Sequence, residues 1–307
     1  MNPVHGTQQA THAHGARAGD HAHLDAGRYA QIDAAHQRLC ALAHGTAATG
    51  RKRHQPPGRR RSAHRRSQQH DPPHRSCTDA TVDDDRILFP NIAPYDSLGA
   101  VATMGSRHYI PMTEIDAQRI VKSFNLAFEF FRRVEAVDHP EAVYHLINWN
   151  YMPPAGSSLI HPHLQVFSTS SAPNLMRQEL DAAQAYRNAA KTNYWDDLVT
   201  AEIANRDRFL GKSGRTTWLS VFAPLGSVGD VIAVVDNVCS TLKLSDGDLL
   251  DLATGLTQLL AAYDRMGIYN FNMSFYAGAE HDDHARFHMI ISPRIYFNPS
   301  IGTPDVA

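Results

Sequence analysis

Residues 156–170 read GSSLIHPHLQVFSTS, a loop of small residues followed by two histidines on either side of a proline. From His163 onward, polar and apolar residues begin to alternate, as in a β-strand with one buried face. Successive side chains of a strand point to opposite faces, so His161, His163 and Gln165 point the same way. The stretch therefore predicts a row of polar side chains on one face of a strand.

Two histidines at this spacing allow three interpretations. A neutral imidazole is a competent nucleophile toward phosphorus, and the proline between the histidines stiffens the backbone that aims them. Gly156, Ser157 and Ser158 would add backbone and hydroxyl donors for a phosphate. The alternatives are a structural pair of histidines and a metal site, because His-x-His is also a ligand spacing. Ser158 before the motif and Gln165 after it favour phosphate chemistry.

The chain around the motif predicts the same succession of elements twice. Strands, a helix, a strand and a histidine-bearing strand follow one another in residues 86–172 and again in 173–307. This pattern indicates an α+β fold of two similar halves, each an antiparallel sheet with packed helices. Strands are predicted from Arg86 and at 98–105, 142–150, 163–169, 216–224, 230–236, 269–277 and 285–293, and helices at 113–134, at 174–192 and from Ser245.

Residues 1–85 differ in composition from the rest of the chain. The run RKRHQPPGRRRSAHRRSQQHDPPHRS at 51–76 has almost no apolar residues, so it cannot bury enough surface to offset its ordering entropy. We expect a low-complexity, poorly ordered segment. Binding of this basic run to RNA or an acidic partner, and a shifted reading frame in a GC-rich gene, stay open as alternatives.

Charge and cysteine content exclude several classes of protein. The formal net charge of −2 gives no overall basic field for a nucleic acid. Cys40, Cys77 and Cys239 are odd in number and widely spaced, which fits reduced thiols. We find no signal-peptide pattern and no apolar run long enough to span a membrane. The sequence therefore predicts a cytoplasmic protein with no nucleic-acid or membrane partner.

The stretch NWNYMPPAGSSLIHPHLQV at 148–166 resembles the galactose-1-phosphate uridylyltransferase family of the histidine-triad superfamily, and the resemblance runs from Arg86 to Phe297. It implies two histidine-triad-like halves. It also implies that His163 attacks the α-phosphorus of a UDP-sugar and carries a covalent uridylyl group, with Gln165 bonded to that phosphate. Asn150 and Ser158 match phosphate-contacting positions of the family. LFPNIAPY at 88–95 is similar to its nucleoside-pocket segment, which gives Asn91 a role in binding base and ribose.

The resemblance implies a structural zinc, but only part of its ligand set is present. His108 and His161 match two ligand positions, whereas the Cys-x-x-C that supplies the other two is missing. We expect no required cofactor, and we regard the zinc site as incomplete. A pair of Cys77 and His74 is the one alternative source of the missing ligands.

A second metal site of the family is also represented only in part. Glu179 and His288 fall at suitable positions, whereas the remaining ligand positions hold Phe275 or Tyr276 and Ile290. We therefore expect this second site to hold no metal.

The resemblance implies a nucleotidyltransferase that moves UMP, or another nucleoside monophosphate, between sugar 1-phosphates through a nucleotidyl-histidine. Its substrates would be a UDP-sugar and a sugar 1-phosphate, placing the protein in galactose and other carbohydrate metabolism, and its state would be a homodimer. Two alternatives stay open. One is a nucleotide-sugar phosphorylase or hydrolase of the same superfamily, and the other is a nucleotide-binding relative without catalysis.

Overall fold

The computed structural model describes residues 80–91, 98–139, 142–226 and 229–294. Residues 1–79 of the expected low-complexity segment lie outside the described residues, and so do Cys40 and Cys77. The first strand lies at Thr81–Asp83, ahead of the boundary expected at Arg86. In the part of the chain that is described, no helix is both long and apolar enough to cross a membrane.

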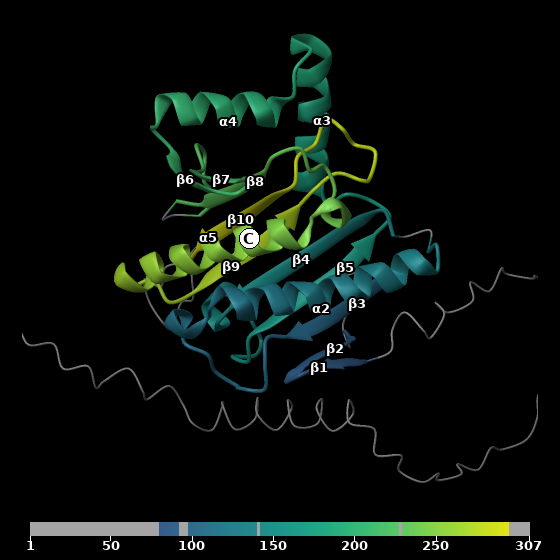
Figure 1. Ribbon diagram of the computed structural model, residues 1–307, viewed down its shortest axis with the longest axis vertical. Helices are drawn as coiled ribbons and strands as arrows, with labels where there is room; N and C mark the ends of the chain where they lie inside the picture. The colour runs from purple at the N-terminus through teal and green to yellow at the C-terminus, as the bar shows by residue number, and fades with distance from the viewer. Residues whose placement is uncertain (1–79, 92–97, 140–141, 227–228, 295–307) are drawn as a thin grey trace, which may run out of the picture. The chain divides into compact units, whose positions relative to one another are not determined.

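The ten described strands belong to one sheet (Figure 1). They are β1 Thr81–Asp83, β2 Arg86–Pro90, β3 Leu98–Thr103, β4 Tyr144–Tyr151, β5 His163–Thr169, β6 Phe209–Ser213, β7 Thr216–Ser220, β8 Val231–Val235, β9 Phe271–Tyr276 and β10 His288–Pro293. Their order across the sheet is β1-β2-β3-β5-β4-β9-β10-β8-β7-β6. Every neighbouring pair is antiparallel.

The order of the strands repeats within this sheet. The first half has the order β2-β3-β5-β4, and the second has β7-β8-β10-β9, so equivalent strands occupy equivalent places. The fold class is confirmed as α+β with antiparallel strands and packed helices. The halves join where β4 pairs with β9, because two strands that would otherwise be open edges satisfy each other's backbone groups there.

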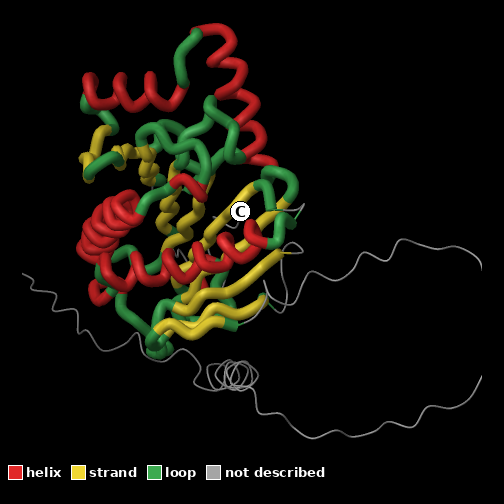
Figure 2. Tube along the Cα trace, turned by 45° about the vertical axis from the view of Figure 1, so that its right-hand side comes forward, coloured by secondary structure: helices red, strands yellow, loops and turns green. Residues whose placement is uncertain are grey.

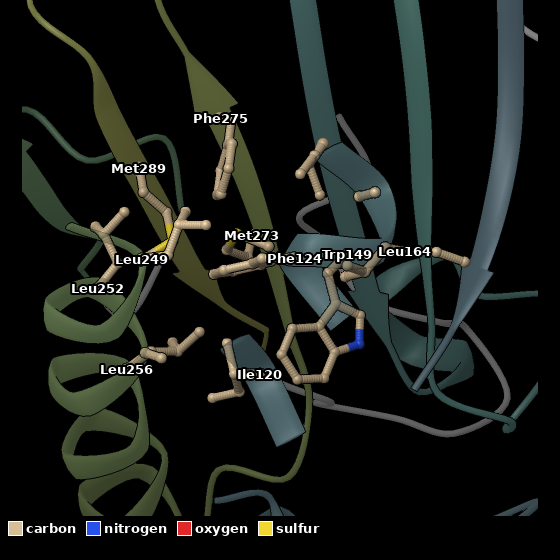
Figure 3. Packing of buried hydrophobic residues seen from close by; sticks show 14 of the residues in the cluster. Ile120, Phe124, Trp149, Leu164, Leu249, Leu252, Leu256, Met273, Phe275 and Met289 are labelled. Carbon is tan, nitrogen blue, oxygen red and sulfur yellow. The ribbon is translucent and has the colours of Figure 1, made fainter. Parts of the chain in front are cut away.

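One face of the sheet is covered by two long helices, α2 (Ala117–Ala136) and α5 (Asp246–Arg265), as Figure 2 shows. Asp116 caps α2 by accepting a hydrogen bond from Arg119 N, so the helix begins four residues later than Thr113, the start predicted from the sequence. Ser245 caps α5, as its sequence predicts. Figure 3 shows how residues of both helices pack on residues of the strands: Ile120, Phe124, Leu249, Leu252 and Leu256 against Trp149, Leu164, Met273, Phe275 and Met289.

The other face is covered unevenly. Helix α3 (Asn174–Ala190) leads into α4 (Tyr194–Asn205), and Trp195 and Val199 of α4 pack on Leu219, Ile232 and Val234 of β7 and β8. Among the described residues, this second cluster includes none from β4 or β5. The sequence patterns did not predict α4, β1 or β6. Short 3₁₀ turns occur at Met112–Glu114, Pro153–Ala155 and Thr241–Lys243.

Candidate active site

His163 is the first residue of β5 and lies opposite Thr103 of β3. Its Nδ1 is 2.8 Å from the carbonyl oxygen of His161. A carbonyl only accepts hydrogen bonds, so Nδ1 carries the proton and Nε2 keeps a free lone pair. Burial lowers the pKa of this imidazole, and the bond to the His161 carbonyl offsets part of that effect. The arrangement holds a neutral imidazole with its nucleophilic nitrogen fixed.

Polar side chains surround His163 on its face of the sheet. Gln165 is two residues along β5 and lies opposite Asn148 of β4. Asn150 lies two residues further along β4, beyond the last β4–β5 pair, and its side chain is on the same face of the sheet as that of Asn148. All four side chains are half-buried, whereas Leu164 between them is buried against the helices. The structure therefore places the predicted residues His163, Gln165 and Asn150 on one face of the sheet and adds Asn148.

The loop between β4 and β5 is tightly constrained. Met152 has φ 74° and ψ 157°, a region that is costly for any residue but glycine. Gly156 has φ 87°, where the lack of a Cβ removes that cost. Ser157 is buried and donates from Oγ to Leu159 O at 2.5 Å, whereas Ser158 is exposed. Of the two predicted serines, Ser158 is thus the one whose side chain faces solvent.

Asn150 belongs to a chain of hydrogen bonds that crosses the middle of the sheet. It lies opposite Asn272 of β9, which donates from Nδ2 to Asn150 Oδ1 at 2.7 Å and to Ala155 O at 2.6 Å. Arg294 donates from Nε to Asn272 Oδ1 at 2.5 Å. Sequence reasoning missed both partners. The polar alternation of β9 could have found Asn272, but no sequence signal links it with a residue 122 positions earlier.

Asn91, predicted to touch base and ribose, follows β2 directly. Its backbone N–H donates to Gly99 O at 3.0 Å, and Gly99 lies opposite Phe167 of β5. Phe167 is four residues beyond His163, or about 13 Å along the strand. Asn91 is therefore outside contact distance of His163 and at a distance that a bound nucleotide could span. The rest of its segment, 92–97, lies outside the described residues.

The two predicted zinc ligands lie close together. The rings of His108 and His161 meet edge to face with centroids 5.4 Å apart. His161 Nε2 donates to Gly105 O at 2.7 Å, which leaves Nδ1 as the nitrogen that a metal could use. A tetrahedral zinc needs two more donors. Within the described ranges no group of three or more His, Cys, Asp or Glu could hold a metal, and Cys77 and His74 lie outside them.

His288 is the second-half equivalent of His163. It opens β10, and its Nδ1 lies 3.0 Å from the carbonyl oxygen of Arg286, two residues earlier, as His163 does with His161. Glu179 approaches Nε2 at 3.4 Å. The ring lies between Trp195, at 4.3 Å, and Tyr276, at 5.3 Å between centroids. The position equivalent to Gln165 holds Ile290, so this half lacks the polar row.

Comparison with solved structures shows that the chain has the fold of GalT-like and uridylyltransferase proteins. A uridylyltransferase superposes with a TM-score of 0.59 at 19% identity, covering 76% of this chain and 82% of that one. A GalT-like protein from Arabidopsis thaliana superposes with a TM-score of 0.58 at 17% identity, covering 71% of this chain and 76% of that one. An ADP-glucose phosphorylase from the same plant superposes with a TM-score of 0.57 at 16% identity, covering 71% of this chain and 74% of that one.

Sequence comparison finds a curated relative whose name gives no function. An uncharacterized protein of Archaeoglobus fulgidus is 28% identical over 212 residues, which are 69% of this chain and 62% of that protein. The chain thus spans less than two thirds of the relative's length. No protein-family model matches the chain.

Proposed function

We propose that this protein is a nucleotidyltransferase that moves a nucleoside monophosphate, UMP in the first instance, between sugar 1-phosphates through a covalent bond to His163. The observation that carries the proposal is the hydrogen bond from His163 Nδ1 to the His161 carbonyl. It leaves the Nε2 lone pair available on the face of the sheet that also carries Gln165 and Asn150.

In the first step, Nε2 attacks the α-phosphorus of a nucleoside diphosphate sugar. A nitrogen–phosphorus bond forms, the bond from that phosphorus to the bridging oxygen breaks, and the sugar 1-phosphate leaves with the bonding electrons. No base is needed, because the attacking nitrogen carries no proton. The imidazole becomes positively charged, and the His161 carbonyl that accepts from Nδ1 stabilises this charge.

In the second step, a phosphate oxygen of another sugar 1-phosphate attacks the same phosphorus and His163 leaves. Both steps place negative charge on the non-bridging oxygens of the transferred phosphate. In our proposal Gln165 and Ser158 donate hydrogen bonds to these oxygens, Asn150 and Asn148 line the same face, and Ser157 holds the loop in place by its bond to Leu159.

The acceptor distinguishes this reaction from its nearest alternative. Orthophosphate attacking the nucleotidyl-histidine would release a nucleoside diphosphate, which is the reaction of a phosphorylase, and water would release the monophosphate. The ADP-glucose phosphorylase superposes as well as the uridylyltransferase does. Supplying galactose 1-phosphate, orthophosphate or neither to the labelled protein separates the three reactions by their products.

The metals are not part of the proposed chemistry. His108 and His161 would hold a zinc if two further donors completed the set, and it would then stabilise the fold ahead of β5. The homodimer and the cytoplasmic location stay predictions. We also keep residues 86–172 and 173–307 as the proposed halves, with the nucleophile in the first.

The test is covalent labelling. The protein is incubated with UDP-glucose or ADP-glucose carrying ³²P at the α-phosphate and run on a denaturing gel at alkaline pH, because a nitrogen–phosphorus bond is labile to acid. We expect label on the wild type and none on His163→Ala. The matched control is His288→Asn, which removes the equivalent histidine of the second half and should still be labelled. A protein that binds nucleotide but takes no label would be a binding protein without catalysis.

A further inference from the structure

Asn150 can face a phosphate in two ways, because a side-chain amide has an accepting end and a donating end. Only the donating end is favourable toward a phosphate oxygen. Asn150 accepts from Asn272 through Oδ1, and its Nδ2 makes no hydrogen bond to any residue within the described ranges. The chain of bonds behind Asn150 therefore decides which end the substrate meets.

Arg294 sets the donor-to-acceptor direction of this series of hydrogen bonds. A guanidinium has donors and no acceptor, and it stays protonated. Asn272 must therefore turn Oδ1 toward Arg294 Nε, as it does at 2.5 Å. Its Nδ2 then points the other way, to Asn150 Oδ1 at 2.7 Å and Ala155 O at 2.6 Å. With Oδ1 occupied, Asn150 presents Nδ2 to the face that carries His163.

We propose that Arg294 and Asn272 are positioning residues that fix Asn150 with its amide donor toward the phosphate of the bound nucleotide. This proposal rests on the proposed function for the identity of the ligand. The hydrogen-bond chain itself is a property of the protein without ligand. These hydrogen bonds connect Asn272 in β9 and Arg294 after β10, both in the second half of the protein, with Asn150 in the first half.

Because Arg294 donates through Nε, substitutions at this position can remove its charge and its hydrogen-bond donor separately. The bond is made by Nε, which is the fourth side-chain atom of arginine counted from Cβ. Glutamine places its amide nitrogen at that position, so Arg294→Gln keeps the donor and loses the charge. Lysine has a methylene there, so Arg294→Lys keeps the charge and displaces the donor. Arg294→Met loses both.

The experiment measures the rate of ³²P labelling from the α-labelled nucleotide sugar in all four proteins. We expect Arg294→Gln to stay within about threefold of wild type, while Arg294→Lys and Arg294→Met fall by about ten- to a hundredfold, the range for one hydrogen bond to a charged group. Arg132→Met is the control, because it removes an exposed arginine of α2. Retention in Arg294→Lys with loss in Arg294→Gln would show a charge effect and overturn the proposal, as would wild-type rates in all three.

A second measurement needs no substrate. Both Nδ2 protons of Asn272 are hydrogen-bonded, so they should exchange slowly with solvent in side-chain ¹H–¹⁵N spectra. We expect slow exchange in wild type and Arg294→Gln and faster exchange in Arg294→Lys and Arg294→Met. Equal exchange in all four overturns the proposal. If the wild type takes no label from any nucleotide sugar, the proposed function fails, and the exchange rates alone decide whether Arg294 orients the amides.

Discussion

His145 gives a quantitative prediction for the stability of the fold. It lies in β4 with 6% of its surface exposed. The ring of Phe131 in α2 packs against the imidazole, with the two ring centroids 4.9 Å apart. Nδ1 is 2.8 Å from Ser168 Oγ, and Nε2 is 3.1 Å from Glu135 Oε1. Burial lowers the pKa of the imidazole from 6.5 to about 4. The folded protein therefore holds this histidine neutral.

The lowered pKa makes stability depend on pH. Below its ordinary pKa of 6.5 the unfolded chain binds a proton at His145, whereas the folded protein binds it only near the lowered value. The contribution of His145 is thus complete above pH 6.5 and is lost as the pH falls toward 4. With about 1.4 kcal/mol for each pKa unit, the free energy of unfolding should fall by about 2 kcal/mol from pH 7 to pH 5 and about 3 kcal/mol by pH 4.

The assay is urea unfolding of the wild type and of His145→Gln at pH 7 and at pH 5. Other titrating groups contribute to both proteins and largely cancel in the difference. We expect the stability advantage of the wild type to shrink by about 2 kcal/mol over this range. His281→Gln, which removes an exposed imidazole, is the matched control. An advantage that stays constant or grows toward pH 5 would show that the folded protein accepts the proton at His145, and the reasoning from burial would be refuted.

The remaining predictions concern the site. Gln165→Ala should slow both half-reactions by roughly 10²-fold to 10³-fold, because one donor is lost at the same phosphate in each; a raised KM at unchanged kcat would make Gln165 a uniform binder. Single-turnover labelling should hold its rate below pH 6.5, since burial lowers the pKa of His163, and a decline centred at or above 6.5 would contradict this. Purified protein should carry well under one zinc per chain and stay active in chelator. Stoichiometric zinc whose removal lowers the Tm would show that His108 and His161 belong to a complete site.

Local sequence patterns predicted most of the strands, because apolar residues either alternate along them, as in β5, or follow one another without interruption, as in β8. The predicted strand at 163–169 has the bounds of β5, and the alternation placed His163 and Gln165 on one face. Helix α4 was missed because only two of its apolar residues, Trp195 and Val199, are buried, so its sequence carries no long apolar stripe. The strand β6 was missed because its glycine and lysine interrupt any apolar run.

The site could be predicted only where its residues are close in the sequence. The motif at 156–170 contains the proposed nucleophile His163, the carbonyl of His161 that holds its ring and the loop that precedes them. Asn272 and Arg294 come from the other half, and only the pairing of β4 with β9 brings them to Asn150. Ser157 was predicted as a donor to substrate, a role that stays a prediction, and its bond to Leu159 depends on the loop conformation.

The pairing of β4 with β9 also bears on whether either half could exist by itself. A fragment ending near residue 172 would leave the backbone N–H and C=O groups of β4 unpaired along Asn148–Tyr151. An unpaired strand edge of this kind tends to pair with another chain. Such a fragment would keep His163 and its carbonyl anchor but lose Asn272. In a single half that existed as a separate chain, pairing of this open strand with the same strand of a second copy would satisfy these backbone groups, and the two-chain assembly would carry His163 twice.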